Sequence, residues 1–196
     1  MINPNFVIIG VLLQLLGCTS YLTDTIKGKV QPNRVTWLLW SIAPLIAFVA
    51  EVQQGVGIIS LATFIVGFCP LLIFIASFFN KKATWNLTKF DIICGILSIL
   101  GLALWLFTRI GNIAIFFSIV ADGLAALPTI VKSFKDPESE NDLPYTLGVV
   151  NAGIGILAIK NWNFQSYGFL IYLLASDLTI AILVRFKLGK RLSRIF

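Results

Sequence analysis

The sequence predicts an all-α integral membrane protein with seven transmembrane helices. Three observations lead to this fold class. Hydrophobic residues make up 58% of the chain and charged residues only 12%, whereas an ordinary soluble domain has about 25% charged residues. A strand-like alternation of polar and apolar residues is absent, which favours a helical bundle over a barrel. About 20 apolar residues suffice for one crossing, and seven such runs follow one another at 5–24, 35–52, 56–79, 88–108, 112–133, 143–160 and 166–185.

The basic residues indicate how these spans are oriented. If the spans alternate in direction, only Arg109 and Lys160 fall on one side of the membrane. The cytoplasmic side of a membrane protein carries the excess of Lys and Arg, so we expect the amino terminus outside and the basic tail in the cytoplasm, near anionic lipid. We expect the protein to lie in a bacterial inner (plasma) membrane and to have no nucleic-acid partner. The other side receives thirteen basic residues: Lys27, Lys29, Arg34, Lys81, Lys82, Lys89, Lys132, Lys135, Arg185, Lys187, Lys190, Arg191 and Arg194.

The chain repeats its plan at an offset of about 105 residues. LGCTSYLTDTIKGKVQPNRVTWLLW at 16–40 corresponds to DGLAALPTIVKSFKDPESENDLPYTLGVV at 122–150. Each copy has a helix of small residues that ends in lysine, a polar linker that contains proline, and an aromatic residue that opens the next helix. These paired positions are Lys27 and Lys132, Pro32 and Pro137, and Trp37 and Tyr145.

Each copy continues into a third span, which leaves the fourth span unmatched between two three-helix units. The two copies then begin on the same side of the membrane and form parallel repeats. The predicted organisation is a first repeat at 1–80, a linker transmembrane helix at 81–110, a second repeat at 111–186, and a basic cytoplasmic tail at 187–196.

This arrangement resembles the SWEET sugar transporters and the wider PQ-loop superfamily, which also includes Pnu-type vitamin transporters. The resemblance covers almost the whole chain at the level of architecture. The superfamily has a Pro-Gln pair near the inner end of the first helix of each repeat, where this chain has Thr23-Asp24 and Pro128-Thr129. An asparagine typical of the superfamily has its counterpart in Asn151. The resemblance implies transport by alternating access, with prolines as hinges.

Two carboxylates lie well inside apolar spans, Asp122 in IVADGLAALPTI and Asp177 in LLASDLTIAI. A charge at the bilayer centre costs about 2.5–3.5 kcal/mol on insertion scales, so we expect both to face a hydrated pocket. Asn151 on the sixth span and Tyr172 on the seventh are further candidates for substrate binding. Small residues beside them also allow close helix packing, and the glycines and alanines of these stripes have that alternative explanation.

Prolines and tryptophans complete the set of candidate residues. Pro128, Pro70 and Pro44 each interrupt a helix and are candidate hinges, although a static kink that suits the packing is the alternative. Trp37 and Trp40 are candidates for stacking on a solute, with membrane-interface anchoring as the alternative.

The function these features favour is transport of a small polar solute, such as a sugar, a nucleoside or a vitamin, by facilitated diffusion or with proton coupling. With no Lys or Arg near mid-membrane, a neutral or cationic solute is favoured. An enzyme is not expected, because the chain has no histidine and no metal-ligand spacing. No cofactor is expected, and the sequence is compatible with a homo-oligomer. The alternative function is a non-transporting receptor or assembly factor with the same fold.

Overall fold

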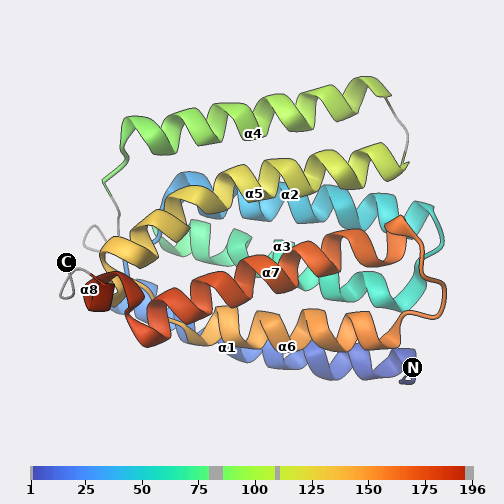
Figure 1. Ribbon diagram of the computed structural model, residues 1–196, viewed down its shortest axis with the longest axis horizontal. Coiled ribbons are helices and arrows are strands. Elements are labelled where there is room, and N and C mark those ends of the chain that lie inside the picture. The colour runs from blue at the N-terminus through green and yellow to red at the C-terminus, as the bar shows by residue number, and fades with distance from the viewer. Residues whose placement is uncertain (1, 80–85, 109–110, 193–196) are drawn as a thin grey trace.

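A computed structural model describes residues 2–79, 86–108 and 111–192, and within these ranges the chain is helical without any strand (Figure 1). Each of the apolar runs seen in the sequence falls on one helix. The long helices are α1 (Val7–Lys27), α2 (Arg34–Gln53), α3 (Ser60–Ala76), α4 (Lys89–Thr108), α5 (Gly111–Lys135), α6 (Leu143–Ala158) and α7 (Phe164–Phe186). The short helices are η1 (Pro4–Phe6), η2 (Gly57–Ile59), η3 (Pro137–Ser139) and α8 (Leu188–Leu192).

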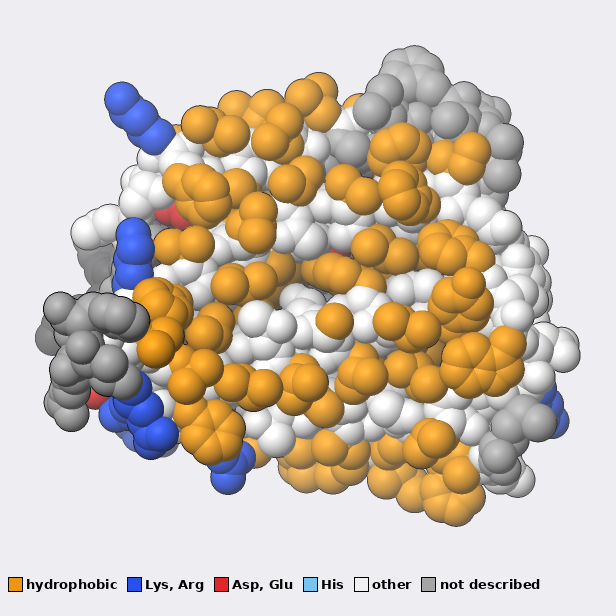
Figure 2. All heavy atoms as spheres, in the orientation of Figure 1, with side chains coloured by type: hydrophobic (Ala, Val, Ile, Leu, Met, Phe, Trp, Pro, Cys, Tyr) orange, Lys and Arg blue, Asp and Glu red, His pale blue; other side chains and the backbone are white. Residues whose placement is uncertain are grey.

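Five helical segments of the described chain are long and apolar enough to cross a membrane, whereas α6 is a shorter apolar helix. The surface agrees with this, because large hydrophobic side chains cover much of the face seen in Figure 2. A soluble monomer rarely exposes so extended an apolar surface, whereas lipid tails accept it. The protein is therefore a membrane protein. The five segments are Pro4–Lys27, Arg34–Gln53, Gly57–Ala76, Asn112–Lys135 and Phe164–Phe186.

Six of the helices surround a common centre. In the described chain α3 packs on α1 and α2, and α7 packs on α5 and α6. The two groups of three meet along two seams, one between α2 and α5 and one between α1 and α6. Helix α4 lies outside these six, against α5 (Figure 1). Side chains from all six helices can therefore meet in one central region.

Local interactions fix where α2 begins and α3 ends. The Asn33 side chain accepts hydrogen bonds from the backbone N–H groups of Val35 and Thr36, which caps the amino end of α2. At the next residue, the Arg34 guanidinium donates to the carbonyl oxygen of Ser77 at 2.7 Å, just past the last turn of α3. The two adjacent helices are thereby tied together at one end of the molecule.

That end carries most of the Lys and Arg side chains of the described chain (Figure 2). Helix α8 also lies there, and both Lys187 and Lys190 pair with Glu138 at 3.0 and 3.1 Å. The hydrogen bonds from Lys187 and then Lys190 hold the pKa of Glu138 below its ordinary value. The amino terminus lies at the opposite end (Figure 1). Four residues named in the sequence analysis lie outside the described residues: Lys81, Lys82, Arg109 and Arg194.

Candidate functional site

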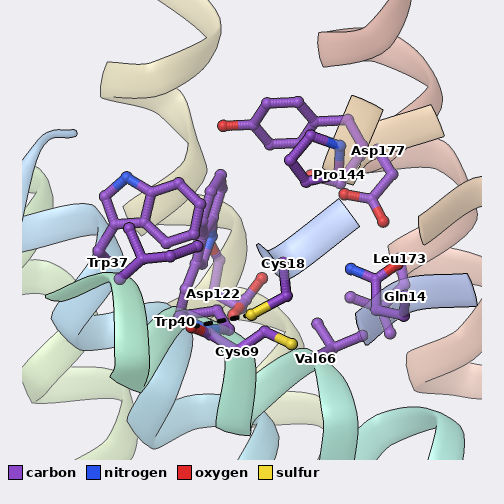
Figure 3. A pocket seen from close by; sticks show the side chains of 14 residues that line it. Gln14, Cys18, Trp37, Trp40, Val66, Cys69, Asp122, Pro144, Leu173 and Asp177 are labelled. Carbon is purple, nitrogen blue, oxygen red and sulfur yellow. Dashed lines mark hydrogen bonds between the residues drawn. The ribbon is translucent and has the colours of Figure 1, made fainter. Parts of the chain in front are cut away.

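A small cavity lies at the centre of the six helices, lined by side chains from each of them (Figure 3). The space that the centre of a water molecule can occupy there is about 40 Å³. About 10–15 Å³ of such space holds one water, so the cavity has room for a few waters. Pockets for drug-sized ligands measure about 300–1,000 Å³. In this conformation the cavity is therefore too small for a drug-sized ligand.

Asp122 lines this cavity from α5 and is 2% exposed. The hydroxyl of Tyr172, on α7, donates to Oδ2 of Asp122 at 2.7 Å. The indole N–H of Trp40, on α2, donates to the backbone carbonyl of Asp122 at 3.3 Å. Among the described residues, Oδ1 of Asp122 has no hydrogen-bond partner. Oδ2 of the Asp122 carboxyl group is thus held in place, while Oδ1 can hydrogen-bond to a molecule bound in the cavity.

Asp177 lines the same cavity from α7, and its carboxyl group lies against the backbone of Gly148 on α6. A Cβ atom at residue 148 would overlap Oδ2 of Asp177. Glycine therefore provides the space that the carboxyl group occupies. Asp122 and Asp177, 55 residues apart in the sequence, are brought to one site because α5 and α7 are neighbours.

Aromatic rings form the opposite side of the cavity, and Figure 3 shows Trp37 and Trp40 across from Asp177. The ring centroids of Trp37 and Trp40 lie 5.4 Å apart, and those of Trp40 and Tyr145 lie 6.2 Å apart. The two tryptophans are 3% and 8% exposed. Buried rings cannot lie among lipid headgroups, so these two are cavity residues and not interface anchors.

A buried polar network lies behind this aromatic wall, on the side of the basic end. Glu140, in the loop between α5 and α6, pairs with Lys132 in the last turns of α5. The hydroxyls of Tyr21 and Tyr145 donate to Oε2 of Glu140 at 2.7 and 3.1 Å. The Lys132 ammonium also donates to the carbonyl oxygen of Gln31, in the loop between α1 and α2.

This network joins the loops of both three-helix groups beside the cavity. The sequence did not reveal this network. Lys132 lies near a helix end and Glu140 lies in a linker, and charged residues at such places are usually exposed to solvent. The available signal was the pairing of linkers in the repeat, which suggests that the two loops are equivalent and adjacent. In a further contact between them, the Gln31 N–H donates to the Ser139 carbonyl oxygen at 3.1 Å.

A cluster of buried apolar side chains adjoins the cavity on the side away from the Lys132–Glu140 network. Leu173 lines the cavity and belongs to a buried cluster with Ala47, Ile115 and Phe169. These residues come from α7, α2 and α5. Their side chains are apolar, so they pack without ion pairs. Ionic contacts thus lie on one side of the cavity and apolar packing on the other.

Asn151 is placed differently from the two aspartates. It is 1% exposed and is not among the residues that line the cavity. Its Nδ2 donates to the carbonyl oxygen of Ala62, on α3, at 3.1 Å. Its side chain also lies against Gly10 of α1, where a Cβ atom would be 2.8 Å from Oδ1 of Asn151. The residue connects α6 to both helices.

The three prolines also occupy different places. Pro70 on α3 lines the cavity. Pro128 on α5 lines a separate pocket on the α4 side, together with Phe90 and Val131. Pro44 is buried in α2, beside the contact between Ala43 and Ala121 that joins α2 to α5.

Two further acidic residues, which lie near span ends in the sequence, are buried. Asp91 is 3% exposed and forms a capping box with Thr88, whose backbone N–H donates to Oδ2 of Asp91 at 2.6 Å. Glu51 is 2% exposed and accepts a hydrogen bond from the Thr63 hydroxyl at 3.1 Å. Although Asp91 lies near a span end, its carboxylate caps the amino end of α4 and is buried there.

Comparison of the chain with models of protein families, with curated proteins and with solved structures finds no match.

Proposed function

We propose that the protein is a transporter of a small polar solute that works by alternating access. The observation that carries this proposal is the small central cavity with Asp122, whose Oδ1 has no partner among the described residues. Burying a carboxylate oxygen without a hydrogen bond costs several kcal/mol by a rough estimate. A cavity that keeps such a group in the middle of apolar helices is suited to binding a polar molecule.

The arrangement of the helices supports two parallel three-helix repeats. In each group of three, the third helix packs between the first two, α3 between α1 and α2 and α7 between α5 and α6. The two seams are equivalent under exchange of the groups, because α2 meets α5 as α6 meets α1. Two such units that rock about a central site provide alternating access. This is also the basis of the proposed likeness to the SWEET and PQ-loop transporters.

The proposed orientation has the basic end in the cytoplasm, following the excess of Lys and Arg on the cytoplasmic side of membrane proteins. The Lys132–Glu140 network would then be the cytoplasmic closure of the cavity, and the cluster around Leu173 the external one. Opening to the cytoplasm requires the loops at 28–33 and 136–142 to separate.

The test is solute flux into liposomes that contain the purified protein. Sugars, nucleosides, vitamins and amino acids are offered in turn, and each accumulated solute is recovered and analysed. A transporter moves at least one class in a saturable way and returns it chemically unchanged, which also separates transport from an aspartate-dependent enzyme reaction. Asp122→Asn should reduce this flux sharply, while Asp24→Asn serves as the control because Asp24 lies outside the cavity.

The alternative function, a receptor or assembly factor, predicts solute binding or protein capture without any flux. Folded protein in sealed liposomes that moves none of the offered solutes would favour that alternative.

A further inference from the structure

We infer, on the basis of the proposed transport function, that the solute is a small organic cation whose charged group binds between the aspartates and the tryptophans of the cavity. Three features of the cavity support this substrate class. They are its two carboxyl groups, which have no Lys or Arg among the other lining residues of the described chain, its aromatic wall, and the way in which the two are divided between the three-helix groups.

Among the described residues, the cavity is lined by acidic side chains and not by basic ones. Asp122 and Asp177 both line it, and no Lys or Arg is found among its lining residues in the described chain. The ammonium of Lys132 is directed to Glu140 and to the carbonyl oxygen of Gln31, outside the cavity. A bound cation would offset the cost of burying the carboxylates, whereas a neutral sugar would leave that cost in place.

The aromatic wall favours an organic cation over a metal ion. An ammonium group is attracted to the face of an indole ring when it lies within about 6 Å of the ring centre. Trp37 and Trp40 supply two such rings, both nearly excluded from water. A hard metal ion such as Ca²⁺ instead requires about six to eight oxygen ligands. Much of the remaining lining is apolar, including Val66, Ile73 and Leu173.

The tryptophans and the carboxyl groups come from different three-helix groups. Trp40 on α2 and Gly148 on α6 occupy matching places when Trp37 is paired with Tyr145. The indole of Trp40 contacts α5 at the carbonyl of Asp122, while Gly148 leaves space for the carboxyl group of Asp177. One group of helices thus contributes the tryptophans and the other contributes both carboxylates, so a cation can contact both at once.

The test measures binding and flux separately. Purified protein in lipid nanodiscs is titrated with choline, phenethylammonium and phenyltrimethylammonium, and the quenching of tryptophan fluorescence is followed. The matched neutral probe is 3,3-dimethyl-1-butanol, which has the shape of choline without its charge, and glucose is a second neutral probe. We expect saturable quenching by at least one cation and binding of the neutral probes at least tenfold weaker.

The variants identify the site. Asp122→Asn and Asp177→Asn should each weaken cation binding by tenfold or more, while the neutral probes change by less than threefold. Asp24→Asn, outside the cavity, should bind as the original protein does. Thermal unfolding of each variant in nanodiscs establishes that it is folded. Uptake of the bound cation into liposomes, driven by an inside-negative membrane potential, then tests transport.

The outcomes separate the two proposals. Cation binding that depends on both aspartates but gives no uptake upholds the cation site and contradicts the transport function. Saturable uptake of a neutral solute without any cation binding upholds transport and overturns the cation site. Quenching by sodium or protons alone, with no effect of the organic cations, also overturns it. So does the absence of any binding by folded protein.

Discussion

Lys132 and Glu140 form an ion pair whose side chains are 1% and 0% exposed, at the junction of the two loops that join α1 to α2 and α5 to α6. Lys132 lies against Oε1 of the glutamate, and two tyrosine hydroxyls donate to Oε2. Breaking a buried pair by removing one partner costs about 3–5 kcal/mol, because the other charge is left without compensation. Both partners of the pair are therefore needed to hold these two loops together.

Glu140→Gln should lower the free energy of unfolding by about 3 kcal/mol or more, since the buried ammonium of Lys132 loses its counter-charge. Thermal unfolding in detergent or nanodiscs measures the change. The matched control is Glu138→Gln, because Glu138 is exposed and its pairs with Lys187 and Lys190 contribute little. The double variant Lys132→Met with Glu140→Gln should recover much of the loss, because the amide still accepts from the two tyrosine hydroxyls and no ammonium is left unpaired. A double variant less stable than Glu140→Gln would contradict the pairing.

Glu140→Gln should also open the cavity toward the basic end. Cys18 lines the cavity and serves as a native probe once Cys69 and Cys94 are replaced by serine. We expect a small cationic methanethiosulfonate, applied from the side of the basic tail, to label Cys18 severalfold faster in the variant. Unchanged labelling, in a variant that is still folded, would mean that the network does not close the cavity.

Gly148→Ala should displace the carboxyl group of Asp177, because the added Cβ overlaps Oδ2. Solute flux should fall, as we also expect for Asp177→Asn. Gly153→Ala is a matched control on the same helix, since a Cβ atom at residue 153 meets nothing within 4 Å. Alanine is also the better helix former by about 1 kcal/mol, so a loss confined to Gly148→Ala cannot come from helix propensity. Equal flux in both variants would remove Asp177 from the site.

Asn151→Ala should act on stability more than on solute affinity, because Asn151 joins α6 to the carbonyl oxygen of Ala62 and does not line the cavity. Loss of the buried hydrogen bond should cost about 1–3 kcal/mol, measured by thermal unfolding, with the KM of uptake unchanged. Asn161→Ala, in the exposed loop before α7, is the control. A large rise in KM without any loss of stability would return Asn151 to the substrate site, as the sequence suggested.

Pro128→Ala tests the hinge hypothesis. Pro128 lies on the α4 side of α5 and not in the cavity, so its replacement should leave solute binding intact and slow the flux. Pro70→Ala changes the cavity itself and serves as the contrast. If Pro128→Ala transports at the original rate, the proline is a static kink.

The sequence by itself determined the positions of the helices, because about 20 consecutive apolar residues suffice to specify a segment that satisfies its own backbone hydrogen bonds in lipid. It also singled out Asp122 and Asp177, since a carboxylate within such a run is costly wherever the helix is placed. The gathering of basic residues at one end followed from the same runs, as the charges lie between them.

Only the tertiary structure decided which inward groups meet. Asp122 and Asp177 share a cavity because α7 packs on α5, and Asn151 is excluded from it because its face of α6 meets α1 and α3. The pairing of Lys132 with Glu140 likewise depends on the approach of two loops. Helical periodicity specifies which residues share a face, but the neighbour of that face is set by the packing of the whole bundle.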